Sequence, residues 1–283
     1  MPVKSLLLAL ALFAAPAMAE GVCVPAGKWQ AGGHSVAAPN VIGDMAAQQA
    51  VLLGEQHAKP AIHAWQAATV AALLDAKRQV VIGIEYLPRS MQPVLDDWVA
   101  GRLSLEEFRA KSRWDELWKH DFNAYRPLLE LARDRHVPMA ALNIDRDFIR
   151  AVGKQGYDAA APAWPGGAPV SKPAAPDPAY VESLKAVFLQ HAREASPEAI
   201  GRFVEAQTVW DRAFAEGMVN ALRAHPGAVV VGVMGQGHVE HGHGAAHQLR
   251  ALGVEKVRTA VPAGATPPCE TAADAADYMF GAQ

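Results

Sequence analysis

Residues 228–238 read Ala-Val-Val-Val-Gly-Val-Met-Gly-Gln-Gly-His, an apolar run that ends in glycines and a histidine. Three other short apolar runs, at residues 51–54, 79–84 and 137–142, have the same character. Continuous β-branched runs are typical of strands buried on both faces, whereas half-exposed strands alternate apolar and polar residues. The four runs therefore predict the central strands of a largely parallel sheet.

Segments with helical periodicity separate and follow these runs. Residues 61–76 form one, Ser104 and Glu107 have the capping-box spacing that starts another, and two amphipathic helices are expected around residues 180–191 and 203–222. Strands that alternate with helices predict an α/β fold, with the sheet covered on both faces. Residues 158–177 are rich in Pro, Ala and Gly and lack an apolar period, so we expect a flexible surface insertion there.

The N-terminus has the order of a secretory signal peptide. Lys4 precedes an apolar stretch at residues 6–15, and Ala17-Met-Ala19 supplies the small residues of a cleavage site. We expect cleavage after Ala19, a periplasmic location, and one domain over residues 20–283. The apolar stretch is too short to span a bilayer, and no later segment is long enough. The formal net charge of −3, about −4 without Lys4, is too mild to predict binding to nucleic acid.

The chain contains two cysteines, Cys23 and Cys269. Two cysteines in an exported protein commonly form a disulfide, which here would connect the two ends of the domain. Lipidation of Cys23 is the alternative. However, the residues before it, Glu20-Gly-Val22, lack the small residue that lipoprotein processing needs directly before the cysteine.

Each of the four buried runs ends in polar residues. These are Glu55 and His57 after the first run, Glu85 after the second, Asn143 and Asp145 after the third, and His238 after the fourth. Ligands of open α/β sheets bind beyond the carboxyl ends of the strands, so we expect these side chains to converge. One Glu or His at a strand end is more often a helix cap, but four such strands favour a site.

The residue types at these positions suit two kinds of chemistry. Two carboxylates with two imidazoles suit a divalent metal, for which His57, Glu85 and His238 are the expected ligands. The same groups suit acid–base catalysis, with Glu55 and Glu85 as the catalytic carboxylates, because close carboxylates raise one another's pKa. The residue types do not choose between these chemistries.

Other side chains are candidates to support the site. Gln207 lies in the apolar stripe of the long helix, where an unpaired amide is costly, so we expect it to reach a polar partner, with Asp211 one turn later on the same side. Trp114, Trp118 and Tyr125 form an aromatic cluster. Such clusters are more often core than cofactor pocket, although this one could wall an apolar cavity.

A histidine-rich segment begins at His238 and continues through His241, His243 and His247. Imidazoles ligate zinc, copper, nickel and haem iron, so His238, His241 and His243 are candidate cofactor ligands. Scattered surface histidines are also common, and His241 and His243 flank a glycine in a predicted loop.

Six motifs in order resemble the ChaN-like haem-binding family, within the group that includes the Tiki proteins and erythromycin esterases. They are residues 52–57 with His63 and Gln66, residues 83–86 with Gln92, residues 118–127, residues 138–143, residues 207–211 and residues 235–238. The resemblance implies a three-layer α/β/α fold around a parallel sheet, and haem binding for iron acquisition at the cell envelope. In the wider group, the positions matching His57, Glu85 and His238 serve metal-dependent or hydrolytic chemistry.

The expected function is therefore that of an exported haem-binding protein. Haem needs an apolar slot and an axial His or Tyr, and the chain has five tyrosines, Tyr125 among them, beside the histidine-rich segment. The alternative is a metal-dependent hydrolase in which His57, His238 and a glutamate hold a metal that activates water. A binding protein with a purely structural polar cluster is a third hypothesis. The sequence leaves open whether two copies share haem in a homodimer.

Overall fold

The structure is a computed structural model that describes residues 21–76, 78–191 and 196–282. The expected signal peptide, residues 1–19 with its cleavage site after Ala19, lies outside the described residues. Among the described residues, no helix is both long and apolar enough to cross a membrane.

Eight strands form one mixed, mostly parallel sheet in the order β2-β1-β8-β7-β3-β6-β4-β5. Their bounds are β1 Trp29–Ala31, β2 His34–Val36, β3 Ala50–Glu55, β4 Val80–Pro88, β5 Met139–Asn143, β6 Val229–Gly235, β7 Val257–Gly264 and β8 Tyr278–Ala282. The six strands from β8 to β5 are parallel, and β1 is antiparallel to both β8 and β2. The four predicted strands are β3, β4, β5 and β6, so the prediction of a largely parallel α/β sheet is confirmed.

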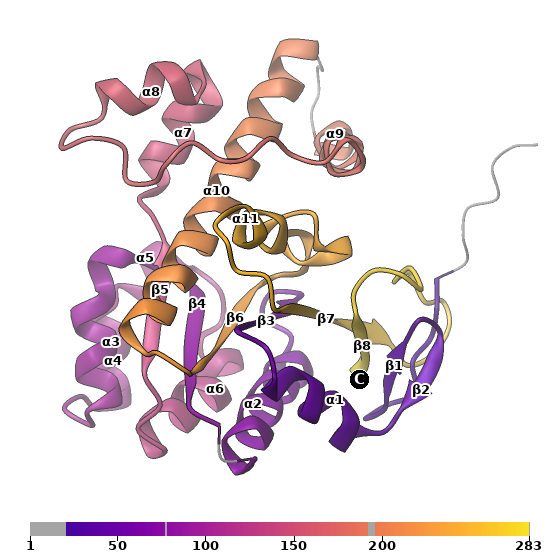
Figure 1. Cartoon of the computed structure of the whole chain (residues 1–283). Helices are drawn as coiled ribbons and strands as arrows, with labels where there is room; N and C mark the ends of the chain where they lie inside the picture. Colours follow the sequence, from indigo (N-terminus) through magenta and orange to yellow (C-terminus); the bar gives the residue numbers. More distant parts are fainter. Residues whose placement is uncertain (1–20, 77, 192–195, 283) are drawn as a thin grey trace, which may run out of the picture.

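Helices cover both faces of this sheet. They are α1 Ala38–Ala46, α2 Pro60–Asp75, α3 Gln92–Val99, α4 Leu105–Lys111, α5 Trp114–Leu117, α6 Phe122–Asp134, α7 Arg146–Gln155, α8 Tyr157–Ala163, α9 Pro178–His191, α10 Pro197–Ala224 and α11 Ala245–Ala251. Helices α1, α2, α3 and α6 pack on one face, while α10 and α11 pack on the other. Figure 1 shows the long α10 crossing the sheet beside α11, with α7, α8 and α9 gathered near the N-terminal part of α10.

Local sequence signals explain where two of these helices begin. Ser104 accepts a hydrogen bond from the backbone N–H of Glu107, whose side chain accepts from the backbone N–H of Ser104, so the capping box expected before α4 is present. Helix α10 begins after Ser196, which caps it by accepting from the N–H of Ala199.

Side chains of the central strands alternate between two hydrophobic cores. In β3, Val51 and Leu53 belong to the core with α2 and α6, whereas Ala50 and Leu52 belong to the core with α10. This alternation follows from the two-residue period of a strand. It determines which helical layer each polar side chain at the strand ends can meet.

The segment 158–177 contains regular structure that the sequence did not predict. Its first part belongs to α8, and its remainder is a chain without regular secondary structure that crosses α10 and reaches α11. Tyr157 donates to the carbonyl of Val170, and the backbone of Ala174 exchanges two hydrogen bonds with the amide of Gln248. The sequence did not predict α8, because Ala160 and Ala161 pack with residues of α7 and α10 although the segment shows no apolar period.

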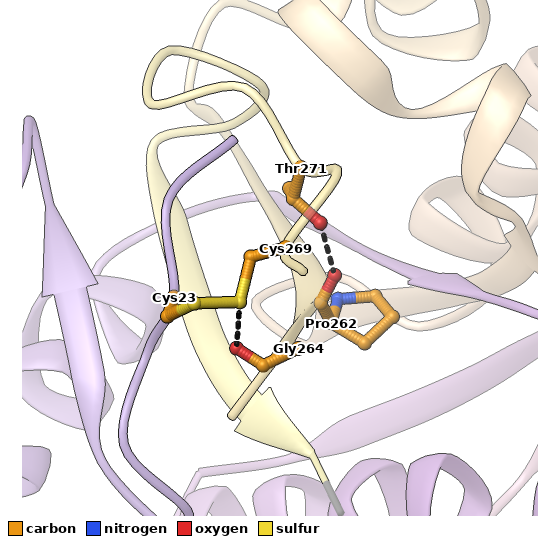
Figure 2. Close-up of a disulfide and its surroundings, with 5 residues drawn as sticks. All are labelled: Cys23, Pro262, Gly264, Cys269 and Thr271. Atoms are coloured by element: carbon orange, nitrogen blue, oxygen red, sulfur yellow. Dashed lines mark hydrogen bonds between the residues drawn. A yellow bond between two sulfur atoms is a disulfide. The ribbon is translucent and has the colours of Figure 1, made fainter. Parts of the chain in front are cut away.

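A disulfide joins Cys23, before β1, to Cys269, between β7 and β8 (Figure 2). The Sγ atom of Cys269 lies 3.4 Å from the carbonyl oxygen of Gly264, and Thr271 donates to the carbonyl of Pro262. The bridge therefore holds the start of the domain against the loop between its last two strands.

Candidate functional site

Two buried carboxylates reach the carboxyl edge of the sheet from opposite faces. Glu55, the last residue of β3, shares the face of Leu53 and so meets the layer of α2 and α6. Glu85 lies in β4 between Ile84 and Tyr86, which both belong to that same layer, so its side chain points to the α10 layer. Glu55 and Glu85 are only 2% and 5% exposed. The carboxylates predicted at the strand ends thus converge, but each one has its own helical layer.

Glu55 is the centre of a buried hydrogen-bond network. Its Oε1 lies 2.8 Å from Nδ1 of His57, and Tyr86 donates to its Oε2 at 2.7 Å. Tyr125 donates to Oε1 at 3.3 Å and also accepts from the backbone N–H of Ala58. These donors compensate the cost of burying the carboxylate.

His57 is fixed by this network in one tautomer. Because the Glu55 carboxylate accepts this hydrogen bond, Nδ1 of His57 carries the proton, and Nε2 has no hydrogen-bond partner among the residues that the structure describes. Burial opposes the charged imidazolium, but the hydrogen bond to Glu55 and the charge of Glu85 together raise the pKa of His57 above its ordinary value. The side chain of His57 is 35% exposed.

His238 is held in the same way on the other face. Its Nδ1 lies 2.8 Å from Oδ1 of Asp211 in α10, and Tyr180 of α9 donates to Oδ2 of Asp211 at 2.9 Å. Burial opposes the imidazolium here too, but the adjacent Asp211 raises the pKa of His238. This contact places Asp211, which we expected to support the site, against His238. Tyr180 as its partner was not predicted.

Gly235, the last residue of β6, lies between the two halves of the site. Its backbone N–H donates to Oε2 of Glu85 at 2.6 Å. A Cβ atom at this position would lie 3.2 Å from Cε1 and 3.4 Å from Nε2 of His57. The glycine therefore keeps open the space between His57 and Glu85. Burial raises the pKa of Glu85, although the nearby His238 and His57 act in the opposite direction.

A pocket of about 340 Å³ opens beside this cluster. Its wall includes Tyr86 and Asn143, and both also belong to the cluster, since Tyr86 binds Glu55 and the amide of Asn143 donates to the backbone carbonyl of Glu85 at 2.9 Å. Asn143 also accepts from the indole N–H of Trp210. Asn143 therefore positions the site through these buried hydrogen bonds.

His63 supports the site from behind. Its Nδ1 lies 3.0 Å from Oε1 of Gln66 and 3.5 Å from Oε2 of Glu55, and the ring is fully buried. Burial lowers the pKa of His63, which favours the neutral ring. The ring also packs against Tyr125 with a centroid distance of 4.0 Å. His63, which we expected among the supporting polar residues, thus lies behind Glu55 in the buried network.

Three predicted site residues lie outside this cluster. Gln207 is half-buried and its amide has no hydrogen-bond partner within the described ranges, so the polar partner that we expected for it stays a prediction. His241 is exposed, with Nδ1 3.8 Å from Asp274, and His243 lies 5.5 Å from His241 and 6.2 Å from the ring of Tyr180.

The aromatic cluster contributes both core and site. Trp114 and Tyr125 are fully buried, as expected for core residues. Trp118 packs edge-on against His57, and His120 lies 4.9 Å from the same ring. His120 was not predicted as a site residue. The only sequence signal for His120 was its position two residues after Trp118, inside the aromatic motif that ends at Tyr125.

His57, Glu85 and His238 are neighbours, but they do not form the metal site that we expected. Within residues 21–76, 78–191 and 196–282, no group of three or more His, Cys, Asp or Glu side chains is arranged to hold a metal ion. What the geometry offers instead is two imidazoles that each donate Nδ1–H to a buried carboxylate and present Nε2. Such an imidazole is a good iron ligand or proton acceptor.

Comparisons with known proteins agree with the motifs. The profile of a family described as haem-binding uptake, Tiki superfamily, ChaN matches residues 41–249. The structure of ChaN of Campylobacter jejuni is similar with a TM-score of 0.72 and 17% identity, over 90% of this chain and 96% of that one. A search of curated protein sequences returns no match.

Two further solved structures are more distant. The type III effector HopBA1 has a TM-score of 0.48 and 10% identity, over 86% of this chain and 91% of that one. The erythromycin esterase EreC has a TM-score of 0.48 and 11% identity, over 79% of this chain and 72% of that one. The likeness to the Campylobacter protein shows a shared fold, and the family profile covers most of the chain. This protein therefore belongs to the ChaN family of haem-binding uptake proteins in the Tiki superfamily.

Proposed function

We propose that this chain is an exported, periplasmic haem-binding protein that serves haem and iron acquisition. Membership of a haem-binding uptake family supports the ligand, and the signal-like sequence before Glu20 supports export. The similar ChaN of Campylobacter jejuni is described by its cofacial haem binding. The observation in this structure that carries the proposal is a pair of imidazoles that each hold Nδ1 against a buried carboxylate and whose Nε2 atoms have no hydrogen-bond partner among the described residues.

The tyrosines are poorly placed to ligate iron. Each of the five hydroxyls already donates a hydrogen bond inside the protein. The acceptors are Glu55 for Tyr86 and Tyr125, the Val170 carbonyl for Tyr157, Asp211 for Tyr180 and Asp44 for Tyr278. Burial raises the pKa of all five, which opposes the phenolate that would bind iron. Tyr125, which we expected as a candidate cofactor ligand, is fully buried.

His57 is the better ligand on three counts. Its Nε2 has no hydrogen-bond partner in the described part of the chain, its side chain is 35% exposed, and its Nδ1 proton is held by Glu55. A carboxylate on the far nitrogen fixes the ring and makes it a stronger ligand. His238 has the same arrangement with Asp211, but its side chain is only 13% exposed. The rings of Trp118 and His120 beside His57 give the apolar, aromatic surroundings that a porphyrin needs.

When bound, haem supplies an iron atom with an open coordination position, and this chain supplies its ligand and its surroundings. Glu55 would orient His57 as the ligand, Gly235 would leave the space of one Cβ atom beside its Nε2, and Trp118 would pack edge-on against its ring. The residues present thus fit haem better than they fit a divalent metal, and we do not propose the metal-dependent hydrolase.

Titration of the mature protein with haemin, followed by absorbance, tests the proposal. We expect a saturable Soret band that shifts or is lost in the His57→Ala variant. His34→Ala is a matched control because His34 is exposed on β2, at the other end of the sheet. A wild-type protein without saturable haemin binding would refute the proposed function. Wild-type binding that His57→Ala leaves unchanged would refute only the choice of ligand.

A further inference from the structure

A second cavity, of about 400 Å³, opens at the amino ends of the strands, at the opposite edge of the sheet from the site described above. Side chains of three loops line it, and these loops lead into the adjacent strands β6, β4 and β5. The loop before β4 carries Arg78, and the loop before β6 carries His225. The loop before β5 carries Arg135 and His136. Two guanidinium groups and two imidazoles therefore line one cavity.

The wall of this cavity carries positive charge without negative charge. Among the described residues, no Asp or Glu lines it, although the whole chain has a formal net charge of −3. Apart from Gln79, the other lining residues are apolar, with Leu74, Val80 and Val137 among them. A concave surface lined by charges of one sign concentrates ligands of the opposite sign. The cavity is thus complementary to an anion.

Arg78 has hydrogen-bond donors that the protein does not use. Its Nε is buried and has no hydrogen-bond partner in the described part of the chain. Its Nη2 lies 3.4 Å from the carbonyl oxygen of Gly227, which is longer than the usual range of about 2.7–3.2 Å. A buried donor without a partner costs free energy, and a bound oxyanion would remove that cost.

Arg135 and His225 offer further donors, whereas His136 does not. Arg135 donates from Nη2 to Asp75 at 3.0 Å, but the two side chains are 45% and 69% exposed, so this ion pair holds the arginine weakly. Within the described ranges the His225 ring makes no hydrogen bond, and even a neutral imidazole has one N–H to donate. His136 already donates its Nδ1 proton to the carbonyl of Val99 at 3.0 Å.

The loops that carry these donors are fixed by the start of the sheet. The N–H of Val229 in β6 donates to the carbonyl of Gln79 at 2.9 Å, and the N–H of Ile82 in β4 donates to the carbonyl of Pro138 at 2.9 Å. Each loop therefore holds its neighbour through the backbone. Donors on loops that are already fixed lose less entropy when a ligand binds.

We propose that this cavity binds a small molecule that carries a carboxylate or phosphate group, with Arg78 and Arg135 as its main partners and His225 as a third donor. A guanidinium group can bind either oxyanion through two parallel hydrogen bonds. The apolar part of the wall favours a ligand with an apolar body behind the oxyanion. The volume lies within the range of about 300–1,000 Å³ that is usual for small-molecule sites.

This anion site is separate from the proposed haem site. Strand β4 connects the two, because Val80 lines the cavity and Glu85 belongs to the cluster at the other edge of the sheet. A rise of about 3.3 Å per residue puts Val80 and Glu85 roughly 17 Å apart. Anion binding and haemin binding should therefore be independent, and this inference does not rest on the proposed function.

The first test is calorimetric titration of the mature protein with inorganic phosphate and, separately, with succinate. We expect saturable binding of at least one of them, and no saturable heat with sodium chloride at equal ionic strength. Tighter binding of phosphate or of succinate supports the site in either case and identifies which oxyanion it prefers. Absence of saturable binding for both anions would overturn the proposal.

The second test uses matched arginine variants. Arg78→Gln and Arg135→Gln should each weaken binding of the preferred anion about tenfold, because each removes charge-assisted hydrogen bonds. Arg109→Gln is the control, since Arg109 resembles Arg135 in being 48% exposed and paired with one aspartate, Asp115. We expect it to change the affinity by less than about twofold. Circular dichroism and urea unfolding verify that each variant is folded.

The remaining outcomes distinguish this proposal from haem binding. Equal anion affinities of Arg135→Gln and Arg109→Gln, both folded, would overturn the site. Saturable phosphate or succinate binding that the Arg78 and Arg135 variants lose would support it even in a protein that fails to bind haemin. A haemin affinity that phosphate leaves unchanged would support the separation of the two sites, whereas competition between phosphate and haemin would overturn it.

Discussion

The backbone N–H of Gly235 donates to Oε2 of Glu85 at 2.6 Å, so the end of β6 holds the carboxylate of the neighbouring strand β4. The same glycine leaves space in front of His57, because an added Cβ would lie 3.2 Å from Cε1 of that ring. Gly235 thus holds the carboxylate of Glu85 and leaves the space of one Cβ atom beside the ring of His57.

Gly235→Ala should therefore weaken ligand binding more than it weakens the fold. Its φ of −50° suits alanine, but the new methyl group would displace the ring of His57 by a few tenths of an ångström. We expect haemin affinity to fall about tenfold, or about 1.4 kcal/mol, in an absorbance titration. Gly237→Ala is the matched control, since an added Cβ there meets nothing within 4 Å. Equal affinities of the two variants would contradict this account of the glycine.

Asp211→Asn should lower the pKa of His238 and reduce stability in a pH-dependent way. The pKa of His238 is raised by Asp211 above its unfolded value of about 6.5, so this contribution is present below that pH and is lost as pH rises through the folded pKa. Removing one partner of a buried pair costs about 3–5 kcal/mol. The deficit of the variant should be larger near pH 6 than near pH 9, as measured by urea unfolding.

The control for this variant is Asp97→Asn, which breaks an exposed ion pair with Arg102. It should change stability by less than about 1 kcal/mol at either pH. NMR titration of the His238 ring in both variants gives the second readout. An unchanged pKa of His238 in Asp211→Asn would show that the carboxylate does not set its protonation.

Tyr125→Phe should reduce stability without removing haem binding. The hydroxyl joins Glu55 to the backbone N–H of Ala58 inside the core, so its loss should cost about 1–3 kcal/mol. Because we assign the iron ligand to His57, haemin affinity should stay within about twofold. Loss of the Soret band in a folded Tyr125→Phe protein would instead identify Tyr125 as the ligand.

Replacing both cysteines, Cys23→Ser with Cys269→Ser, should lower the free energy of unfolding by at most about 5 kcal/mol in the loop-entropy model. Intact mass of the mature wild-type protein provides a direct check, since the disulfide leaves Cys23 without an acyl chain. A lipid adduct on Cys23, or a double variant as stable as the wild type, would contradict the role given to this bridge.

The sequence predicted the centre of the sheet better than its edge. Strands β3 to β6 are continuous apolar runs, whereas β7 is interrupted by Arg258 and Pro262, and β1 and β2 have three residues each. Short or interrupted strands resemble loops because their stability comes from neighbours that only the fold supplies. The parallel core was thus predictable, and the antiparallel edge was not.

In the site, too, the sequence indicates residues at strand ends but not contacts that depend on how distant helices pack. Glu55, Glu85, His57 and His238 were predicted because each follows a recognisable strand. The bond from Tyr180 to Asp211 connects two helices whose packing no local pattern reveals, so it was not predicted. The polar partner that we expected for Gln207 stays a prediction, because helical periodicity gives the face of a side chain but not the group that the side chain meets.

Glu55 belongs to the helical layer of α2 and α6, and Glu85 meets the layer of α10, so neither layer alone can assemble the site. A chain in which only one of the two cores has condensed holds one imidazole in place and leaves the other without its carboxylate anchor. Ligand capture is thereby restricted to fully folded molecules. Completion of both cores would then come before any ligand binds at the site.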